Sequence, residues 1–283
     1  WGTPLDPEKF KKALEEDTQK EIKAVILTHS ETSTGVINDL KTISSYIRKH
    51  NTALSIVDCV TSLGACNVPV DEWELDIVAS GSQKGYMIPP GLSFIAISQK
   101  AWEAAEKSNL PKFYLNLKSY KKSLLSNSNP YTPAVNLVFA LDESLKMMRE
   151  EGLDNIFFRH NKHKLAMSNA VKALNLELFA DEKYLSPSIT AVKTEGIDAE
   201  EFRKTIKNNF DILLAGGQDH MKGKIFRVGH LGYVNDRDII TVVSAIGNTL
   251  LKLGKITAQQ AGEALVVASR SVSYTHLRAH ETR

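Results

Sequence analysis

Short apolar runs alternate with amphipathic helical patterns through the first half of the chain, and this alternation restricts the fold more than any other feature. Runs of about five apolar residues suit buried strands, and the helical patterns between them suit the crossovers of parallel βαβ units. The expected strands cover residues 24–28, 54–57, 76–79 and 93–97. The expected helices cover residues 7–16, 40–50 and 99–107. The predicted fold class is therefore α/β, a mostly parallel sheet flanked by helices.

The pattern changes near residue 150, after a Pro-, Ser- and Asn-rich crossing at 109–133. The elements expected beyond that crossing are helices at 134–151, 158–174, 199–208 and 239–251 and strands near 189–192 and 225–228. Residues 1–150 are thus predicted to form a large domain and residues 151–254 a smaller C-terminal α+β domain. Residues 255–283 are left unassigned. Roughly the last 13 of them, an odd mixture of His, Arg and Thr, are expected to be non-native.

Charge and cysteine content exclude several classes of function. A formal net charge of +2 gives no electrostatic case for a nucleic-acid or membrane partner, and no apolar run is long enough to span a bilayer. Cys59 and Cys66 cannot by themselves bind zinc or an iron–sulfur cluster, so no metal site is expected. The expected location is soluble and intracellular, cytoplasmic or organellar, and the C-terminus carries no peroxisomal signal.

Polar residues follow three of the expected strands, at the edge where parallel α/β sheets bind ligands. Asp58 ends one strand, and Ser82 and Lys84 lie in the turn after the next strand. An amino-group transfer needs a lysine that bonds a cofactor aldehyde, a carboxylate on the cofactor ring nitrogen and hydroxyls for a phosphate. Taken singly, such an Asp is most often a helix cap or turn residue and such a Lys a surface residue. The occurrence of these residues together, in this order after the strands, favours a catalytic site.

Four stretches then show a resemblance to a known family. They are residues 29–35 (HSETSTG), 57–64 (VDCVTSLG), 81–91 (GSQKGYMIPPG) and 226–232 (FRVGHLG). In these stretches the chain resembles the alanine–glyoxylate and serine–pyruvate (serine–glyoxylate) aminotransferases, class V members of the fold-type-I pyridoxal-phosphate enzymes. The similarity runs over residues 1–254. It implies a large domain with a mostly parallel sheet, a smaller C-terminal domain and pyridoxal 5'-phosphate as cofactor.

The resemblance implies roles for the cofactor-binding residues. Lys84 is expected to form the Schiff base and Asp58 to pair with the pyridine nitrogen. Val60 is expected to pack on one face of the ring, although a plain core position would look the same in sequence. Thr32 is expected to place a hydroxyl near the phenolic oxygen of the cofactor.

Further residues are matched to the family in the same way. Ser82 and Gln83 are expected to help hold the ring substituents and the phosphate. Arg227 is expected to grip the substrate α-carboxylate, a role that suits its planar, bidentate guanidinium. Asn129 and Thr132 match a loop that reaches the cofactor phosphate of a neighbouring subunit, so a homodimer is expected.

The chain departs from the family pattern at its start. The family has a sizeable segment before the position of Trp1, with a glycine-rich turn for the phosphate and a residue that stacks on the ring. We therefore expect an N-terminally truncated chain that holds the cofactor weakly. A second expectation concerns His160 and His163, which lie among basic residues and are predicted to occupy a solvated helix face.

The function implied is transfer of an amino group from a small amino acid, alanine or serine, to glyoxylate or pyruvate by a ping-pong mechanism. One alternative is a cysteine desulfurase or another class V enzyme. A desulfurase needs a mobile thiol late in the chain, and no cysteine follows Cys66. Another alternative is a non-catalytic partner, since members of this subgroup have been labelled the small subunit of a soluble hydrogenase. The joint presence of Asp58 and Lys84 favours an enzyme.

Overall fold

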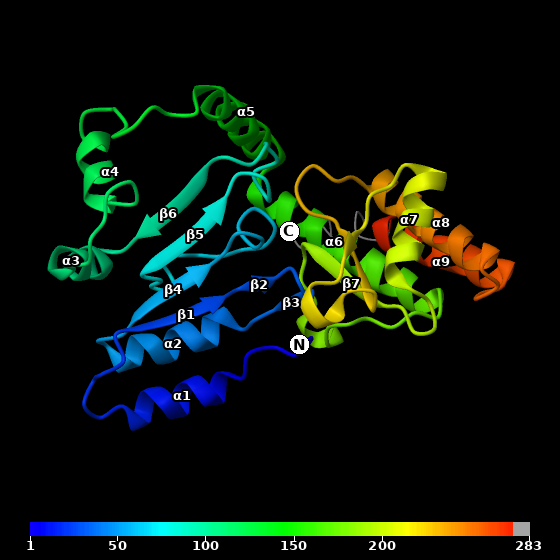
Figure 1. Cartoon of the computed structure of the whole chain (residues 1–283), viewed down its shortest axis with the longest axis horizontal. Helices are drawn as coiled ribbons and strands as arrows, with labels where there is room; N and C mark the ends of the chain where they lie inside the picture. Colours follow the sequence, from blue (N-terminus) through cyan, green and yellow to red (C-terminus); the bar gives the residue numbers. More distant parts are fainter. Residues whose placement is uncertain (274–283) are drawn as a thin grey trace, which may run out of the picture.

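A four-stranded sheet with strand order β1-β4-β5-β6 organises the first half of the chain in the computed structural model, which describes residues 1–273 (Figure 1). Its strands are β1 (Ala24–Thr28), β4 (Leu54–Asp58), β5 (Ile77–Gly81) and β6 (Ser93–Ile97). The first three run parallel, and β6 is antiparallel to β5. The predicted α/β class with a mostly parallel sheet is confirmed.

Two helices, α1 (Pro7–Glu16) and α2 (Leu40–His50), lie on one side of this sheet (Figure 1). Both begin at an aspartate whose side chain accepts a backbone N–H of the first turn, as expected of a good N-cap. The apolar face of α2 packs on the alternate strand residues that point toward it. The shared core contains Leu27, Val57 and Val78 from the strands and Leu40, Ile43 and Ile47 from α2.

The remaining strand residues, at the alternate positions, point to the opposite face of the sheet. Ile26 is 76% exposed and Ile95 48% exposed. Thr28 of β1 is paired with Asp58 of β4, so the Asp58 side chain belongs to this same face and is exposed. Apolar residues point to both faces of the sheet, so the strands read in the sequence as nearly continuous apolar runs.

After β6 the chain runs through α3 (Gln99–Lys107) and α4 (Leu117–Leu124) and returns along the β6 side of the sheet to α5 (Val135–Glu151) (Figure 1). We call residues 110–125 the α4 segment. Its large apolar side chains are mostly exposed: Leu110, Phe113, Tyr114, Leu115, Leu124 and Leu125 are 60–84% accessible. The predicted irregular crossing is thus largely correct, with one short helix inside it.

The second half forms an antiparallel three-stranded sheet, order β7-β9-β8, packed with four helices. The elements are α6 (Leu153–Ala173), β7 (Ile189–Lys193), α7 (Ala199–Phe210), β8 (Ala215–Gly216), β9 (Ile225–Gly229), α8 (Asp236–Lys252) and α9 (Ala258–Ser273), with short 3-10 turns at Glu182–Tyr184 and Asp219–Met221. This part has its own hydrophobic core, which includes Phe202, Phe226 and Ile246. None of the helices within residues 1–273 is both long and apolar enough to cross a membrane.

Helix α9 lies within residues 255–283, which are unassigned from the sequence alone. Its Ala264 and Ala268 are fully buried, and the helix packs against α6 and α8. Small side chains allow this close packing but give a weak apolar signal in sequence. Val272 also belongs to the core, so the first three residues of the stretch expected to be non-native are part of this helix. The rest of that stretch, 274–283, lies outside the described residues.

Candidate active site

The carboxyl ends of β1, β4 and β5 point toward the second half of the chain, and the motif residues follow these ends (Figure 1). After β1 comes a short hairpin of β2 (Ser30–Glu31) and β3 (Val36–Ile37). Thr32 lies at its tip, and we call it the Thr32 hairpin. Asp58 ends β4. Lys84 lies in a loop after β5, and we call residues 82–87 the Lys84 turn.

Glycines bring the loops after β4 and β5 into direct backbone contact. A Cβ atom on Gly85 would lie 2.2 Å from the carbonyl oxygen of Leu63, and one on Gly64 would lie 3.0 Å from the Cα of Gly85. Gly64 also has a φ of +80°, which favours glycine. Only glycine at both positions permits this approach. The contact therefore holds the Lys84 turn beside the loop that Asp58 begins.

Asp58 and Lys84 are both accessible to a ligand. The Asp58 side chain is exposed, and its Oδ1 accepts the N–H of Val60 at 2.8 Å, which orients the carboxylate. Lys84 is half-buried, and no side-chain hydrogen bond or ion pair among residues 1–273 engages its amine. Val60 and Gln83 lie near each other, since a Cβ on Gly81 would be 3.8 Å from Val60 Cγ1 and 3.1 Å from Gln83 Oε1.

Arg227, on β9, joins the second domain to the Thr32 hairpin. Its Nη1 donates to the carbonyl oxygen of Thr32 at 2.6 Å, and its Nε donates to the carbonyl oxygen of Gly216 at 2.8 Å. The side chain is only 8% exposed. Burial and the nearby Arg203 lower the pKa of Arg227, against the opposing effect of Glu31, yet a guanidinium stays protonated at neutral pH. The structure thus brings Thr32 and Arg227 together.

The same junction contains other buried polar contacts. Ser30 Oγ and Ser186 Oγ are 2.8 Å apart, and Thr61 Oγ1 donates to the carbonyl oxygen of Ser30 at 2.7 Å. Ser188 Oγ donates to the carbonyl oxygen of Thr61. These contacts connect the loops after β1 and β4 with the segment before β7. They fix the second domain against the carboxyl edge of the sheet.

Ser82 has a structural contact of its own. Its side chain is fully buried, and its hydroxyl donates to the carbonyl oxygen of Pro89 at 2.8 Å and accepts the N–H of Leu92 at 3.1 Å. Ser82 therefore closes the loop that carries Lys84. Its contact with a phosphate stays a prediction.

Within residues 1–273 no hydrogen bond joins Asn129 or Thr132 to another predicted site residue. Both are exposed in the connection between α4 and α5, which runs along the β6 side of the sheet (Figure 1). The neighbouring Tyr131 is held by its hydroxyl, which donates to the carbonyl oxygen of Phe113 at 3.0 Å. Their predicted role at a neighbouring subunit is therefore compatible with their position and stays a prediction.

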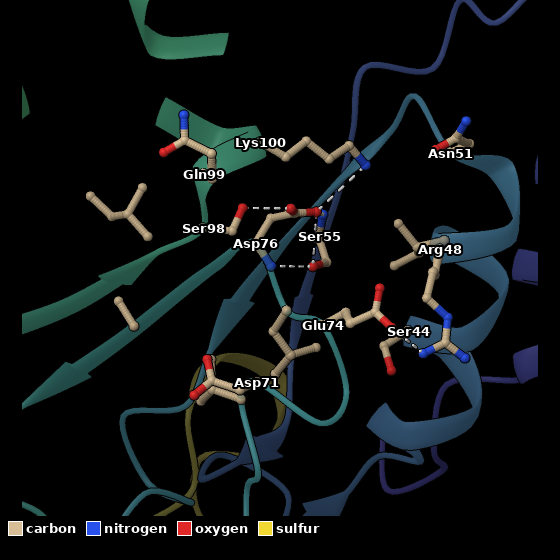
Figure 2. Close-up of a pocket in the computed structure, with 15 residues that line it drawn as sticks. Ser44, Arg48, Asn51, Ser55, Asp71, Glu74, Asp76, Ser98, Gln99 and Lys100 are labelled. Carbon is tan, nitrogen blue, oxygen red and sulfur yellow. Dashed lines mark hydrogen bonds and ion pairs between the residues drawn. The ribbon is translucent and has the colours of Figure 1, made fainter. Parts of the chain in front are cut away.

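A separate cavity of about 490 Å³ lies at the opposite end of the sheet (Figure 2). Its central group is Asp76, which accepts the N–H of Ser55 at 2.9 Å and the hydroxyl of Ser98 at 2.7 Å, with Lys100 Nζ at 3.8 Å. Arg48 is paired with Glu74 at 2.9 Å. Because these groups bind one another, the network ties β4, β5 and the start of α3 together, and we assign it a structural role.

The arrangement of sheet, second domain and loops is shared with solved aminotransferases. The ureidoglycine–glyoxylate aminotransferase of Bacillus subtilis matches with a TM-score of 0.87 and 33% identity, over 95% of this chain and 70% of that one. The fold is therefore that of the pyridoxal-phosphate-dependent transferases of fold type I.

The sequence narrows this class to one family. The model of the family described as Aminotransferase class-V matches residues 4–234, and the chain belongs to this family. It is 59% identical over 254 residues to a soluble hydrogenase 42 kDa subunit of Anabaena cylindrica, covering 90% of this chain and 66% of that protein. It is 36% identical over 266 residues to a serine–glyoxylate aminotransferase of Methylorubrum extorquens, covering 91% and 66%. The chain spans about two thirds of the length of these relatives.

The cofactor of this family is pyridoxal 5'-phosphate, and the residues present fit it. The Asp58 carboxylate and the Lys84 amine are the kinds of group that this cofactor needs, and their roles toward it stay predictions. Within residues 1–273 the Lys84 amine has no hydrogen-bond or ion-pair partner, and Asp58 is exposed at the same edge of the sheet, so both groups are available to a cofactor. Burial lowers the pKa of His29 to about 4, so its ring is neutral. No group of three or more side chains able to hold a metal ion occurs among residues 1–273.

The prediction that His160 and His163 lie on a solvated helix face is wrong. Both are fully buried, and Lys162 is 6% exposed. The basic neighbours concealed the true period of α6, in which Ile156, His160, His163 and Met167 share one buried face. The spacings of four, three and four residues along Ile156, His160, His163 and Met167 are the sequence signal that predicts the burial of the two histidines. Arg159 and His160 hydrogen-bond to Gly232, which lies against the carbonyl oxygen of Lys84.

Proposed function

We propose that this chain provides the catalytic residues of an aminotransferase that moves the amino group of a small amino acid, alanine or serine, to glyoxylate or pyruvate. The observation that carries the proposal is the backbone contact between Gly64 and Gly85, which holds the Lys84 turn beside the loop of Asp58. The family membership gives the reaction type. The names of relatives that act on serine and glyoxylate support the substrate class.

The residues have distinct roles in this proposal. Pyridoxal phosphate, when bound, supplies an aldehyde and a ring that accepts an electron pair from the substrate α-carbon. Lys84 holds the cofactor through Nζ and, as an unprotonated amine, moves the α-proton of the substrate. The Asp58 carboxylate keeps a proton on the ring nitrogen. Val60 packs against the ring, and Thr32 offers its hydroxyl to the phenolic oxygen.

Arg227 binds the substrate carboxylate. Its contacts with Thr32 and Gly216 use Nε and one N–H of Nη1, which leaves Nη2 and the second N–H of Nη1 for a ligand. Two N–H groups on one edge of a guanidinium match the two oxygens of a carboxylate. Because every α-amino acid has this carboxylate, Arg227 fixes orientation and leaves the choice of side chain to other residues.

The proposed active form is a homodimer, in which Asn129 and Thr132 reach the cofactor phosphate of the other subunit. The exposed apolar side chains of the α4 segment support it, because monomers rarely expose so many large apolar residues together. Within one chain, Gln83 would help to hold that chain's own cofactor phosphate, and Ser82 would act by closing the loop that carries Lys84.

A desulfurase is not proposed, because its chemistry requires a reactive thiolate. Burial raises the pKa of Cys59 to about 11 and that of Cys66 to about 12, so both thiols are protonated at neutral pH. The hydrogenase name belongs to the relative from Anabaena cylindrica. No observation in this chain favours that role over amino transfer.

Covalent labelling of Lys84 tests the proposal. The chain is incubated with pyridoxal phosphate, reduced with borohydride, digested and examined by peptide mass spectrometry. We expect the pyridoxyl label on Lys84, and prior incubation with alanine should reduce it, because transfer consumes the bound aldehyde. Lys84→Arg should lose at least about 90% of the label, since a guanidinium is not the nucleophile required. Lys172→Arg, at an exposed lysine paired with Glu182 and outside the α4 segment, is the matched control and should label normally. Labelling spread over surface lysines and unchanged by Lys84→Arg would contradict the proposal.

A further inference from the structure

Two neighbouring residues of α6 hold both backbone polar groups of Gly232. Arg159 Nη1 donates to the carbonyl oxygen of Gly232 at 2.8 Å, and the N–H of Gly232 donates to His160 Nε2 at 3.1 Å. Arg159 Nη1 also donates to the carbonyl oxygen of Val234 at 3.0 Å. We call residues 230–234 the Gly232 loop. Its backbone is thus fixed by side chains rather than by a strand or helix.

The Gly232 loop lies directly against the Lys84 turn. A Cβ atom on Gly232 would be 3.1 Å from the carbonyl oxygen of Lys84 and 3.4 Å from Met87 Cγ. The φ of Gly232 is +82°, so glycine is favoured for conformation as well as for space. The same Lys84 oxygen accepts the N–H of Met87 at 3.1 Å, which closes the turn. A displacement of Gly232 would therefore change the packing of the turn that carries the amine.

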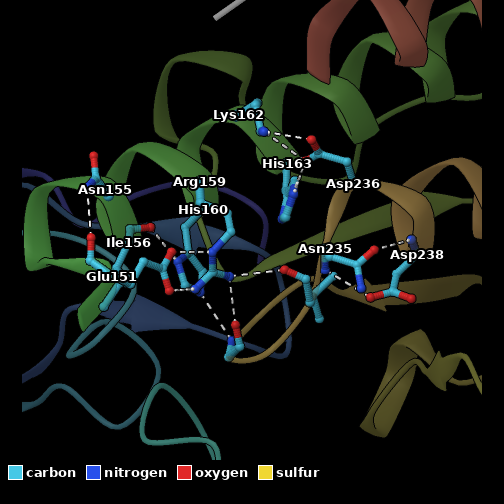
Figure 3. Close-up of polar contacts among 12 residues, drawn as sticks. Glu151, Asn155, Ile156, Arg159, His160, Lys162, His163, Asn235, Asp236 and Asp238 are labelled. Atoms are coloured by element: carbon cyan, nitrogen blue, oxygen red, sulfur yellow. Dashed lines mark hydrogen bonds and ion pairs between the residues drawn. The ribbon is translucent and has the colours of Figure 1, made fainter. Parts of the chain in front are cut away.

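The two α6 side chains are themselves oriented by further contacts (Figure 3). Glu151 accepts two bonds from Arg159, at 2.6 Å from Nε and 2.9 Å from Nη2, which fixes the guanidinium plane. His160 Nδ1 is 2.8 Å from the carbonyl oxygen of Ile156. That oxygen can only accept and the N–H of Gly232 can only donate, so His160 must be the neutral tautomer protonated at Nδ1. Burial lowers the pKa of His160 to about 4, which agrees with this assignment.

We propose that Arg159 and His160 are positioning residues, which act through the backbone of Gly232 to hold the Lys84 turn in place for the cofactor. The inference rests on the proposed function, since it assumes that Lys84 is the cofactor lysine. Within residues 1–273 no hydrogen bond joins Arg159 or His160 to Asp58, Thr32 or Arg227, and their bonds to this part of the chain go to the Gly232 loop. A third contact supports the turn from α5, where Ser144 Oγ donates to the carbonyl oxygen of Tyr86.

Amide hydrogen exchange of the chain without cofactor tests the first half of the inference. His160→Leu removes the acceptor for Gly232, and the Met87 N–H should then exchange at least about 10-fold faster, because the turn opens more often. His160→Gln retains an acceptor near the Nε2 position and should restore slow exchange. His163→Leu is the matched control. His163 is equally buried on the same helix, but its Nε2 contacts Asp236 at 2.9 Å instead of the Gly232 loop.

The rate of pyridoxyl labelling at Lys84, measured on the same variants, tests the second half. We expect His160→Leu to slow labelling roughly 10-fold, with His160→Gln and His163→Leu within about 2-fold of the unmodified chain. If His160→Leu fails to fold, Arg159→Met replaces it, because it removes only the bonds to Gly232, Val234 and Glu151.

Equal effects of His160→Leu and His163→Leu, or no recovery in His160→Gln, would overturn the inference. Absence of label on Lys84 in the unmodified chain would instead count against the proposed function. The exchange result would then still decide whether α6 holds the turn, so the two failures are distinguishable.

Discussion

Glycine has a steric role at several positions around Lys84. Gly85 and Gly64 contact each other across two loops, and Gly232 contacts the Lys84 carbonyl oxygen from the second domain. In each case a methyl group would meet backbone, which cannot rotate away as a flexible side chain can. The position of the Lys84 amine therefore depends on residues that have no side chain of their own. These contacts explain in physical terms why the motifs have glycine at these positions.

Gly85→Ala should consequently impair the site. The added Cβ would lie 2.2 Å from the Leu63 carbonyl oxygen, so the two loops must separate. We expect a loss of about 2–4 kcal/mol in the free energy of unfolding and a fall in Lys84 labelling. Chemical denaturation and the borohydride assay measure these two quantities. Gly229→Ala is the control, because no atom of residues 1–273 outside its own neighbourhood lies within 4 Å of its Cβ position. If both variants behave like the unmodified chain, the loops are not held by this contact.

For single residues, the sequence predicts which residues belong to the site, but it does not predict which atoms they contact. The order of Asp58, Ser82 and Lys84 after apolar strands predicts their shared edge, because strand periodicity and βαβ topology are local or nearly local. The bond from Arg227 to the Thr32 carbonyl joins residues 195 positions apart, and no local pattern encodes it. His160 was misplaced because charged neighbours outweighed the apolar period.

Among the elements, the α4 segment differs most from the rest of the fold. Leu115 is 80% exposed and Leu125 84% exposed, in a stretch that has few contacts with the sheet. An aromatic cluster around Tyr131 gives the stretch some internal order, with Phe113 and Tyr114 rings 5.7 and 4.8 Å from it. A segment that exposes large apolar side chains in one chain is stabilised when another protein surface covers it.

We expect that the covering surface is a second copy of the chain. Sedimentation velocity should show a dimer, and Leu115→Glu should weaken it. A buried Leu contributes about 1.5–3 kcal/mol, and a two-fold interface contains the residue twice, so the dissociation constant should rise roughly 100-fold or more. Leu213→Glu is the matched control, since Leu213 is 77% exposed but lies between α7 and β8, away from the segment. A monomer at all concentrations, or equal effects of the two variants, would contradict the dimer.

Most elements are predictable because their signals are local. Helices α1 and α2 have an aspartate cap and an apolar stripe, and their predicted bounds match the structure. Strand β5 begins one residue later and extends two residues further than predicted, into the Ser80–Gly81 pair that looked like a break. Helix α9 was missed, because its buried face is built of alanines whose burial depends on α6 and α8.

At the level of the whole molecule, two hydrophobic cores meet across a polar junction. One core lies between the sheet and α2, and the other surrounds β7 and β9. The junction contains buried hydrogen bonds, among them those of Ser30 and Arg227. Burial keeps His29, which precedes Ser30, and His230, which bonds to Pro187 and Thr190, neutral. Polar groups at such a junction need fixed protonation states, since an added charge would have no partner. The free energy with which the two cores are held together should therefore depend on pH.

Acidification should destabilise the chain before its carboxylates are protonated. Burial lowers the pKa of His29 and His160 to about 4 and that of His230 to about 3. An unfolded histidine binds its proton near pH 6.5, so between about pH 6.5 and 4 the unfolded state binds more protons and the free energy of unfolding falls as pH falls. Each of the three should contribute on the order of 3 kcal/mol over that window. Denaturant unfolding at pH 7, 6, 5 and 4.5 measures the slope, and His160→Gln, which cannot titrate, should reduce it, while the other buried histidines, His163 among them, account for the rest. Stability that stays level between pH 7 and 5, or rises on acidification, would show that these rings are not held neutral in the folded chain.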